Sequence, residues 1–414
     1  MNEAKQKFRL TSLERAWILY DVGNSAFVLL VATLIPIFFN ALAEGGGLSS
    51  VEYLAYWGYA ASAVTVITAV LSPILGTLAD TRNFKKPIFT FCVAVGVIGC
   101  CAMGMASTWL PFLLIFILAK VGFSGSLVFY DSMLSDVTVP DRMDEVSSKG
   151  YAWGYIGSCV PFVVCLALVL GAGSIGISQM TALNLALFIT AAWWLVTTLP
   201  LLRQYKQVHF VEVQEHAIRQ SFARIGHTLR HLKEDRQVFW FLLAFFCYID
   251  GVYTIIDMAT AYGTALGLDT TGLLLALLVT QIVAFPSALV FGRLSGQYPS
   301  GTLIPVCIAA YAGIALFAFF LKHQWQFWVL AVVVGMFQGG IQALSRSHFA
   351  KIIPPEKSGE YFGLFDICGK GASFLGTMIV SVGSQLTGSA NVGVGSLIVL
   401  FIVGFVLFRV SDQK

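Results

Sequence analysis

Residues 339–376 read GGIQALSRSHFAKIIPPEKSGEYFGLFDICGKGASFLG, and this stretch joins two long apolar helix patterns through a short charged turn. Pro354 and Pro355 end the first pattern, because proline lacks the N–H group that would continue a helix. Asp366 and Lys370 then lie four residues apart inside the second apolar pattern. Ionisable residues inside a helix long enough to cross a bilayer indicate a membrane protein rather than a soluble core.

The composition of the whole chain agrees with a membrane location. Of its 414 residues, 57% are hydrophobic and 11% are charged, whereas an ordinary soluble domain has about 25% charged residues. Apolar runs of membrane-spanning length cover approximately residues 17–39, 53–79, 87–107, 110–134, 150–172, 180–199, 238–266, 271–294, 303–322, 325–349, 361–384 and 392–408. We therefore expect an all-α polytopic membrane protein with twelve transmembrane helices.

The positive charges predict how the chain is oriented in the membrane. Of the 25 Lys and Arg residues, all but Lys120, Lys322 and Lys370 fall in the ends and loops of one side. Short loops rich in Lys and Arg remain in the cytoplasm. We therefore expect a multi-pass protein of the cell membrane with both termini cytoplasmic.

A polar segment at residues 201–237 divides the chain into two sets of six helices, at residues 1–200 and 238–414. Its apolar residues recur at helical spacing among basic ones, which predicts an amphipathic helix that lies on the lipid surface or packs against the ends of the bundle. The two halves also share a short pattern, YDVGNS at 20–25 and YIDGVYT at 248–254. Internal similarity between six-helix halves is typical of transporters that bind substrate between the halves, near the middle of the bilayer.

Two sets of motifs carry a family resemblance. GTLADTRNFKK at 76–86 resembles the Gly-x-x-x-Asp-Arg-x-Gly-Arg-Arg loop of the major facilitator superfamily, with Gly76 and Asp80 matching. YDVGNSAF at 20–27, CYIDGVYTI at 247–255 and the ALSRS, PPEKS and FGLFD elements of residues 339–376 are similar to the vacuolar amino-acid effluxer-like family of that superfamily. The resemblance implies two pseudo-symmetric halves, a central cavity lined by the first, fourth, seventh and tenth helices, and outward movement of amino acids.

Ionisable residues inside the apolar runs are the candidates for binding, since each costs roughly 2.5 to 3.5 kcal/mol at a helix centre on insertion scales. Lys120 and Asp250 lie near the middles of the fourth and seventh helices, and Asp257 follows Asp250 by two turns. We expect Asp250 or Asp257 to bind a substrate ammonium group or to carry a coupling proton, and Lys120 to attract a carboxylate. The alternative is an ion pair that joins the two helices. Asp21 and Asn24, one turn apart in the first helix, are further candidates.

Other charged residues lie nearer the cytoplasmic ends of the helices and are expected to form a gate. They are Asp80, Asp131, Arg346, Asp366 and Lys370.

Two of these gate residues are spaced as an ion pair. Asp366 and Lys370 have the i, i+4 spacing and order that favour an ion pair within one helix. Alternatively, Lys370 exchanges between Asp366 and Asp21 or Asp131 as the cavity opens. Asp80 is expected at the positive N-terminus of the eleventh helix, near residues 359–361, where it would join the halves in the outward-open state.

The sequence thus predicts a secondary active transporter that moves a small solute, most directly amino acids outward, by alternating access coupled to protons. A membrane-embedded lipid-modifying enzyme and a receptor or scaffold are the alternatives. The chain lacks the HExxH, GxSxG and Walker motifs of common enzyme classes. Its eight cysteines show no CxxC spacing. We expect no cofactor, no metal site and no nucleic acid partner, and a monomer in contact with its solute and the lipid bilayer.

Overall fold

The structure of the protein is a computed structural model that describes residues 8–212, 226, 228, 230 and 232–412. Apart from one isolated β-bridge between Thr81 and Val211, the regular structure of these residues is helical. The elements are α1 (Ser12–Ala32), α2 (Leu34–Gly45), α3 (Ser50–Ala79), α4 (Lys85–Met103), α5 (Trp109–Ser132), α6 (Leu134–Val137), α7 (Pro140–Leu170), α8 (Gln179–Gln204), α10 (Arg236–Ala265), α11 (Thr270–Leu294), α12 (Ser300–Phe319), α13 (Gln324–Ile352), η1 (Pro355–Lys357), α14 (Ser358–Thr387), α15 (Ala390–Gly395) and α16 (Ile398–Asp412).

Local sequence fixes several of the helix ends. Thr11 caps α1: its side chain accepts a hydrogen bond from the Glu14 backbone N–H, and the Glu14 carboxylate accepts one from the Thr11 backbone N–H. Ser49 and Glu52 make the same reciprocal cap at α3. These caps satisfy N–H groups that otherwise lack an acceptor at the start of a helix. Pro355 begins the short 3₁₀-helix η1, which separates α13 from α14 as the proline pair predicts.

Eleven helical stretches within the described residues are long and apolar enough to cross a membrane. Two of them combine neighbouring helices, since α1 with α2 forms the span Ser12–Gly45 and α15 with α16 forms the span Ala390–Asp412. α14, with 30 residues, occupies the place of the eleventh predicted segment. With α14 included, the helices match the twelve predicted segments, and the predicted fold class is confirmed.

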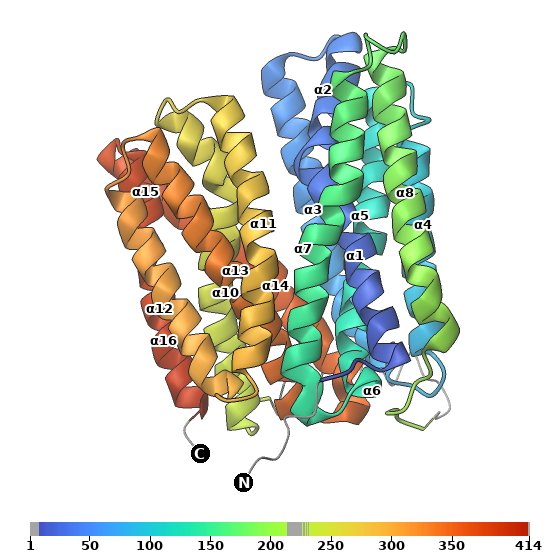
Figure 1. Cartoon of the computed structure of the whole chain (residues 1–414), viewed down its shortest axis with the longest axis vertical. Helices are drawn as coiled ribbons and strands as arrows, with labels where there is room; N and C mark the ends of the chain where they lie inside the picture. Colours follow the sequence, from blue (N-terminus) through green and yellow to red (C-terminus); the bar gives the residue numbers. More distant parts are fainter. Residues whose placement is uncertain (1–7, 213–225, 227, 229, 231, 413–414) are drawn as a thin grey trace.

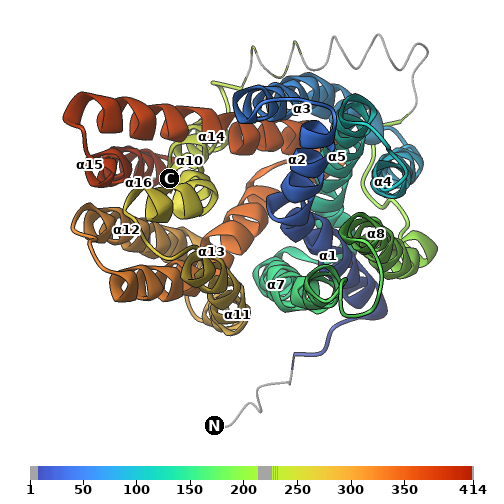
Figure 2. The ribbon, with the colours of Figure 1, turned by 90° about the horizontal axis from the view of Figure 1, so that it is seen from above.

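Helices α1–α8 and α10–α16 form two groups that lie side by side (Figures 1 and 2). The start of α1 and the end of α16 lie at the same end of the molecule, the lower end in Figure 1, which we call the terminal side. Contacts between the groups join α3 and α5 to α14, and α7 to α11 and α13. Residues such as Ile218 and Phe222, predicted to form an amphipathic helix, lie outside the described part of the chain.

Glycines allow the two groups to approach each other closely on the terminal side. A Cβ atom at Gly76 of α3 would overlap the carbonyl oxygen of Gly359 of α14, and a Cβ at Gly359 would overlap that of Gly76. A second crossing resembles the first, because a Cβ at Gly292 of α11 would lie 2.8 Å from the Cβ of Ser148 of α7. Any side chain at position 76 or 359 would push backbone against backbone, so this contact requires glycine.

Candidate functional site

Arg346, near the terminal-side end of α13, reaches from the second group of helices into the first. Its Nη1 donates to Asp131 Oδ1 over 3.0 Å, and its Nη2 lies 3.6 Å from Asp21 Oδ2. Its Nε donates to the Ser147 hydroxyl over 2.9 Å, and Nη2 donates to the Ser147 carbonyl over 3.1 Å. Because Arg346 is only 2% exposed, its charge is stabilised by these protein groups rather than by water.

Three aromatic rings surround the same guanidinium. Its central carbon lies 4.3 Å from the ring centroid of Tyr151, 4.7 Å from that of Trp17 and 5.4 Å from that of Tyr130. Desolvated cation–π contacts contribute about 2 kcal/mol or more. We call the surrounding residues the arginine cage: Trp17, Asp21, Tyr130, Asp131, Ser147 and Tyr151. All six belong to the first group of helices, whereas Arg346 belongs to the second.

A second charged contact between the groups lies where α3 meets α14. Oδ1 of Asp80 accepts a hydrogen bond from the Gly359 backbone N–H over 2.7 Å, and Oδ2 accepts one from the Glu360 N–H over 2.9 Å. The first N–H groups of a helix carry partial positive charge, which favours a carboxylate there. Asp80 is fully buried. The structure therefore has Asp80 at the position predicted from sequence, while its role in gating stays a prediction.

Lys85 connects Asp80 to a carboxylate that sequence analysis did not single out, Asp136 of α6. Nζ of Lys85 lies 3.9 Å from Asp80 Oδ1 and 3.6 Å from Asp136 Oδ2, and it donates to the Ser358 hydroxyl over 2.8 Å. The side chains of all three charged residues are completely buried. One lysine between two carboxylates lets all three charges remain buried, because each has a partner.

Asp136 also binds the chain segment that follows α8. The Tyr205 hydroxyl donates to Asp136 Oδ2 over 2.5 Å, and the Val208 and His209 backbone N–H groups donate to Oδ1. The His209 ring Nδ1 lies 3.0 Å from the same oxygen. This hydrogen bond raises the pKa of His209 by stabilising the protonated ring. Burial acts to raise the pKa of Asp136, but the charge of Lys85 and these hydrogen bonds together lower it below its usual value.

Further contacts join the two groups near the terminal side. Asp366 of α14 accepts a hydrogen bond from the Ser72 hydroxyl of α3 over 2.7 Å. Nζ of Lys351 of α13 lies 2.6 Å from Oδ2 of Asp144 of α7. The Lys370 side chain lies outside the described residues, so its predicted pairing with Asp366 or exchange to other acids stays a prediction. Among the described residues, Arg346 pairs with both Asp21 and Asp131.

Lys120 of α5 and Asp257 of α10 lie farther from the terminal side and on opposite groups of helices. Asp257 is exposed and Lys120 is partly exposed, although both belong to membrane-spanning helices. Their charges interact across the boundary between the groups. Nζ of Lys120 also lies 4.9 Å from the ring centroid of Phe123. These two residues thus place exposed or partly exposed opposite charges on different groups of helices, within the membrane-spanning segments.

Asp250 has a different environment from Asp257, although two turns of α10 separate them. It is fully buried, and its Oδ1 accepts hydrogen bonds from the Gly376 N–H over 2.9 Å and the Thr254 hydroxyl over 3.3 Å. Its Oδ2 has no hydrogen-bond partner among the described residues. A Cβ at Gly376 would lie 2.6 Å from Asp250 Oδ1. Asp250 therefore faces α14 within its own half, and Asp257 is the more accessible of the two acids.

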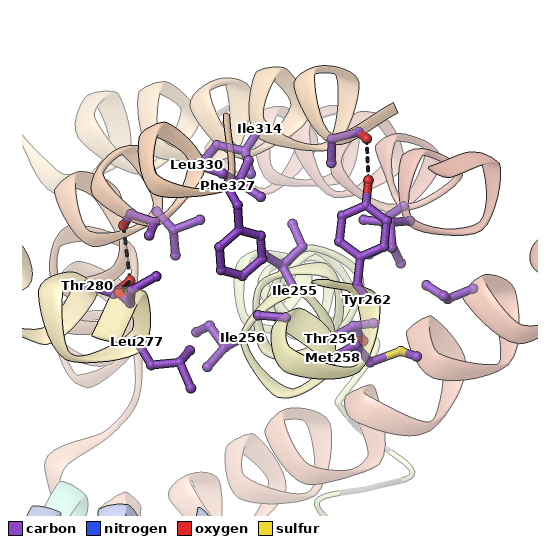
Figure 3. Close-up of a pocket in the computed structure, with 18 residues that line it drawn as sticks. Thr254, Ile255, Ile256, Met258, Tyr262, Leu277, Thr280, Ile314, Phe327 and Leu330 are labelled. Carbon is purple, nitrogen blue, oxygen red and sulfur yellow. Dashed lines mark hydrogen bonds between the residues drawn. The ribbon is translucent and has the colours of Figure 1, made fainter. Parts of the chain in front are cut away.

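The second group of helices also encloses an apolar cavity of ≈ 50 Å³, with residues of α10, α11 and α13 around it (Figure 3). Two hydroxyl groups at its edge are bonded to the backbone, since Tyr262 donates to the Ala318 carbonyl and Thr280 donates to the Ala331 carbonyl. The rest of the lining is almost entirely carbon, including Ile255, Phe327 and Leu330. The described lining residues of the cavity offer no charged group to a charged solute.

Some of these residues carry sequence signals that our sequence analysis did not use. Trp17 precedes Asp21 by one helical turn, and Tyr130 is adjacent to Asp131, so aromatic and acidic residues share a helix end. A cation–π and carboxylate site is a reasonable interpretation of such spacing. The residue that occupies the site, Arg346, is however 215 residues from Asp131 in the sequence. No local sequence pattern predicts a contact over that separation.

Comparison with known families gives a match over nearly the whole chain. The family described as Vacuole effluxer Atg22 like matches residues 12–141 and 135–414. An uncharacterized MFS-type transporter, YxiO, of Bacillus subtilis is 42% identical over 98% of this chain and 96% of its own length. Autophagy-related protein 22 of Coccidioides immitis is 24% identical over 83% of this chain and 70% of its own length.

Solved structures show a related arrangement of helices. The human organic anion transporter MFSD10 has a TM-score of 0.73 at 12% identity, with 96% of this chain and 98% of that chain covered. The major facilitator superfamily transporter FucP, in its outward conformation, has a TM-score of 0.72 at 17% identity, with 97% and 98% covered. At these identities the similarity supports the fold and leaves the solute open.

Proposed function

Because the chain belongs to the Vacuole effluxer Atg22 like family and is a transporter of the major facilitator superfamily, we propose that it exports amino acids by alternating access. The observation that carries this proposal is the pair of accessible opposite charges on Lys120 and Asp257. An α-amino acid has a carboxylate and an ammonium group close together. Lys120 would attract the carboxylate and Asp257 the ammonium group, and the low dielectric of the surrounding membrane would strengthen both attractions relative to water.

The terminal side is the cytoplasmic side in this proposal, because it carries the loops rich in Lys and Arg. The contacts of Arg346, Asp80 and Asp366 then join the halves on the cytoplasmic side, which corresponds to an outward-facing state. We propose that residues 1–200 and 238–414 move as two rigid halves, linked by residues 201–237. Asp80, Asp131, Arg346, Asp366 and Lys370 would form the cytoplasmic gate and separate as the cavity opens inward. The protein would act as a monomer in the cell membrane.

Asp250 is our candidate for a coupling proton. Its Oδ2 is buried without a hydrogen-bond partner among the described residues, and a proton there would remove a charge that is costly to bury. Its contact with Gly376 would let a change of charge on α10 alter the position of α14. Asp21 and Asn24, joined by a 3.4 Å hydrogen bond, would bind solute only when the arginine cage opens.

Purified protein in sealed liposomes tests the proposal. We expect uptake of at least one amino acid down a gradient, with a KM raised about tenfold in Asp257→Asn and in Lys120→Met. Asp269→Asn is the matched control, because Asp269 only caps α11 and lies outside the charged pair. A panel of all common amino acids that gives no flux, with and without a proton gradient, would overturn the proposal. If Asp250→Asn kept both the flux and its dependence on pH, Asp250 would not carry the proton.

A further inference from the structure

The arginine cage is a preformed binding site for a planar cation. Trp17 and Tyr130 are completely buried, their rings stack with centroids 4.4 Å apart, and Trp17 Nε1 donates to the Tyr130 carbonyl over 2.9 Å. Asn24 donates to Asp21 Oδ1 and holds that carboxylate in place. These contacts come from the first half alone, so they can hold Trp17, Tyr130 and Asp21 in place when Arg346 is absent.

Gly150 of α7 keeps space for the cation. A Cβ at this position would lie 2.9 Å from Asp21 Oδ2 and 3.1 Å from the Arg346 Nη2 atom. The site thus has hydrogen-bond acceptors around the edge of the cation, namely two carboxylates and the Ser147 oxygens. Aromatic rings lie against the cation. A guanidinium group has the matching planar shape, with several N–H donors and faces that stack on rings.

Arg346 belongs to the other half and must leave the cage when the halves separate on the terminal side. Asp21 and Asp131 then lose the compensating charge of Arg346, and an uncompensated carboxylate such as the buried Asp21 is costly. Another cation that enters by the opened side would restore both the charge balance and the ring contacts. The cage can therefore hold either Arg346 or an outside cation, but not both.

We propose that the vacated arginine cage binds the cationic side chain of a transported basic solute, of the chemical class of arginine or lysine. Arg346 and the solute then occupy the same cage in turn. Solute in the cage keeps the terminal side open, and its passage to Lys120 and Asp257 farther inside lets Arg346 return and close that side behind it. This inference rests on the proposed transport function and extends it by naming a substrate class.

Binding to the emptied cage can be measured without transport. Arg346→Ala vacates the cage, and methylguanidinium at millimolar concentration should raise the unfolding temperature of this variant. The unfolding temperature of wild-type protein should not change, because Arg346 fills the site. The unfolding temperature of Arg346→Ala/Asp131→Asn should not change either. No stabilisation of Arg346→Ala, or equal stabilisation of the double variant, would overturn the proposal.

Transport gives a second test that does not require Arg346→Ala to fold. In liposomes we expect Tyr151→Leu to lower the ratio of L-arginine to L-leucine transport about tenfold, through loss of the ring contact. Trp153→Leu is the matched control on the same helix, since its ring contacts Phe285 outside the cage, and it should keep the wild-type ratio. An unchanged ratio in Tyr151→Leu would refute the proposal. If no amino acid moved at all, the transport function would fail, while methylguanidinium binding would still decide the question of the cage.

Discussion

Asp80 Oδ1 lies 2.7 Å from the backbone nitrogen of Gly359, so a carboxylate at the end of α3 caps a helix that belongs to the other half of the protein. The contact replaces the intrahelical acceptors that the first N–H groups of α14 lack. It also depends on relative position, because it breaks when the halves move apart by a few ångströms. In the alternating-access cycle that we propose, a helix cap of this kind would stabilise the closed terminal side over the open one.

Asp80→Asn should weaken this conformation. The amide has one acceptor oxygen in place of two, loses the charge that the helix N-terminus favours, and leaves Lys85 with Asp136 as its remaining acid in the cluster. We expect spin labels on the terminal-side ends of α3 and α14 to show a larger separated population, and transport to slow while solute binding persists. Asp269→Asn, a cap within one half, should leave the distances unchanged. Loss of solute binding in Asp80→Asn would contradict a purely conformational role.

Gly76→Ala should prevent the same closure by sterics alone. Its Cβ would overlap the carbonyl oxygen of Gly359, which is backbone and cannot rotate away. We expect transport to fall at least about tenfold and the terminal side to become accessible to thiol reagents at introduced cysteines. Gly58→Ala on the same helix is the control, since nothing lies within 4 Å of a Cβ at that position. Transport in Gly76→Ala equal to that in Gly58→Ala would show that the halves do not need this crossing.

The binding of the linker by Asp136 should depend on pH. The pKa of His209 is raised above its usual 6.5 in the folded protein, so its stabilising effect is full below pH 6.5 and is lost as pH rises through the raised pKa. The pKa of Asp136 is lowered, so its effect is present above pH 3.8 and is lost only as pH falls through the lowered value. The bound segment should therefore be most stable in mildly acidic solution, between these limits.

Hydrogen exchange measures this dependence. The protection factors of the Val208, His209 and Val211 amides, which donate to Asp136 or to the Asp80 carbonyl, should be higher at pH 6 than at pH 8. His209→Asn should remove most of the difference, whereas His323→Asn, at an exposed position far from Asp136, should retain it. Lys85 and Glu356 also act on the pKa of His209, which is raised with both of them included, so pH-independent protection in wild-type protein would contradict the role we assign to His209.

The sequence was sufficient for the membrane fold but not for most of the contacts that hold its halves together. A long run of apolar residues indicates a segment that lies in lipid, so the positions of the helices in the sequence follow from hydropathy. The position of Asp80 was also predictable, because the helix start after Pro355 is a local feature and the acid belongs to a recognisable loop. The arginine cage was not predictable, because Arg346 and Asp131 are 215 residues apart in the sequence. A basic residue at position 346 is also explained equally well by the preference of helix ends for basic residues. Lys85 looked like one of several loop cations, yet its side chain is completely buried.

Arg346→Lys should test whether geometry or charge matters in the cage. Lysine keeps the charge but loses the planar donors that bind Ser147 and Asp131 together, along with most of the ring contact. We expect a lower unfolding temperature and a larger terminal-side-open population than in wild-type protein, with a bigger effect in Arg346→Ala.

Removing one partner of a buried ion pair costs about 3–5 kcal/mol, so Arg346→Ala/Asp131→Asn should be no less stable than Arg346→Ala. The control is Lys351→Met, whose partly exposed ion pair with Asp144 should contribute about 1 kcal/mol or less. If Arg346→Lys behaved as wild type, charge alone would hold the gate, and the aromatic rings of the cage would need another explanation.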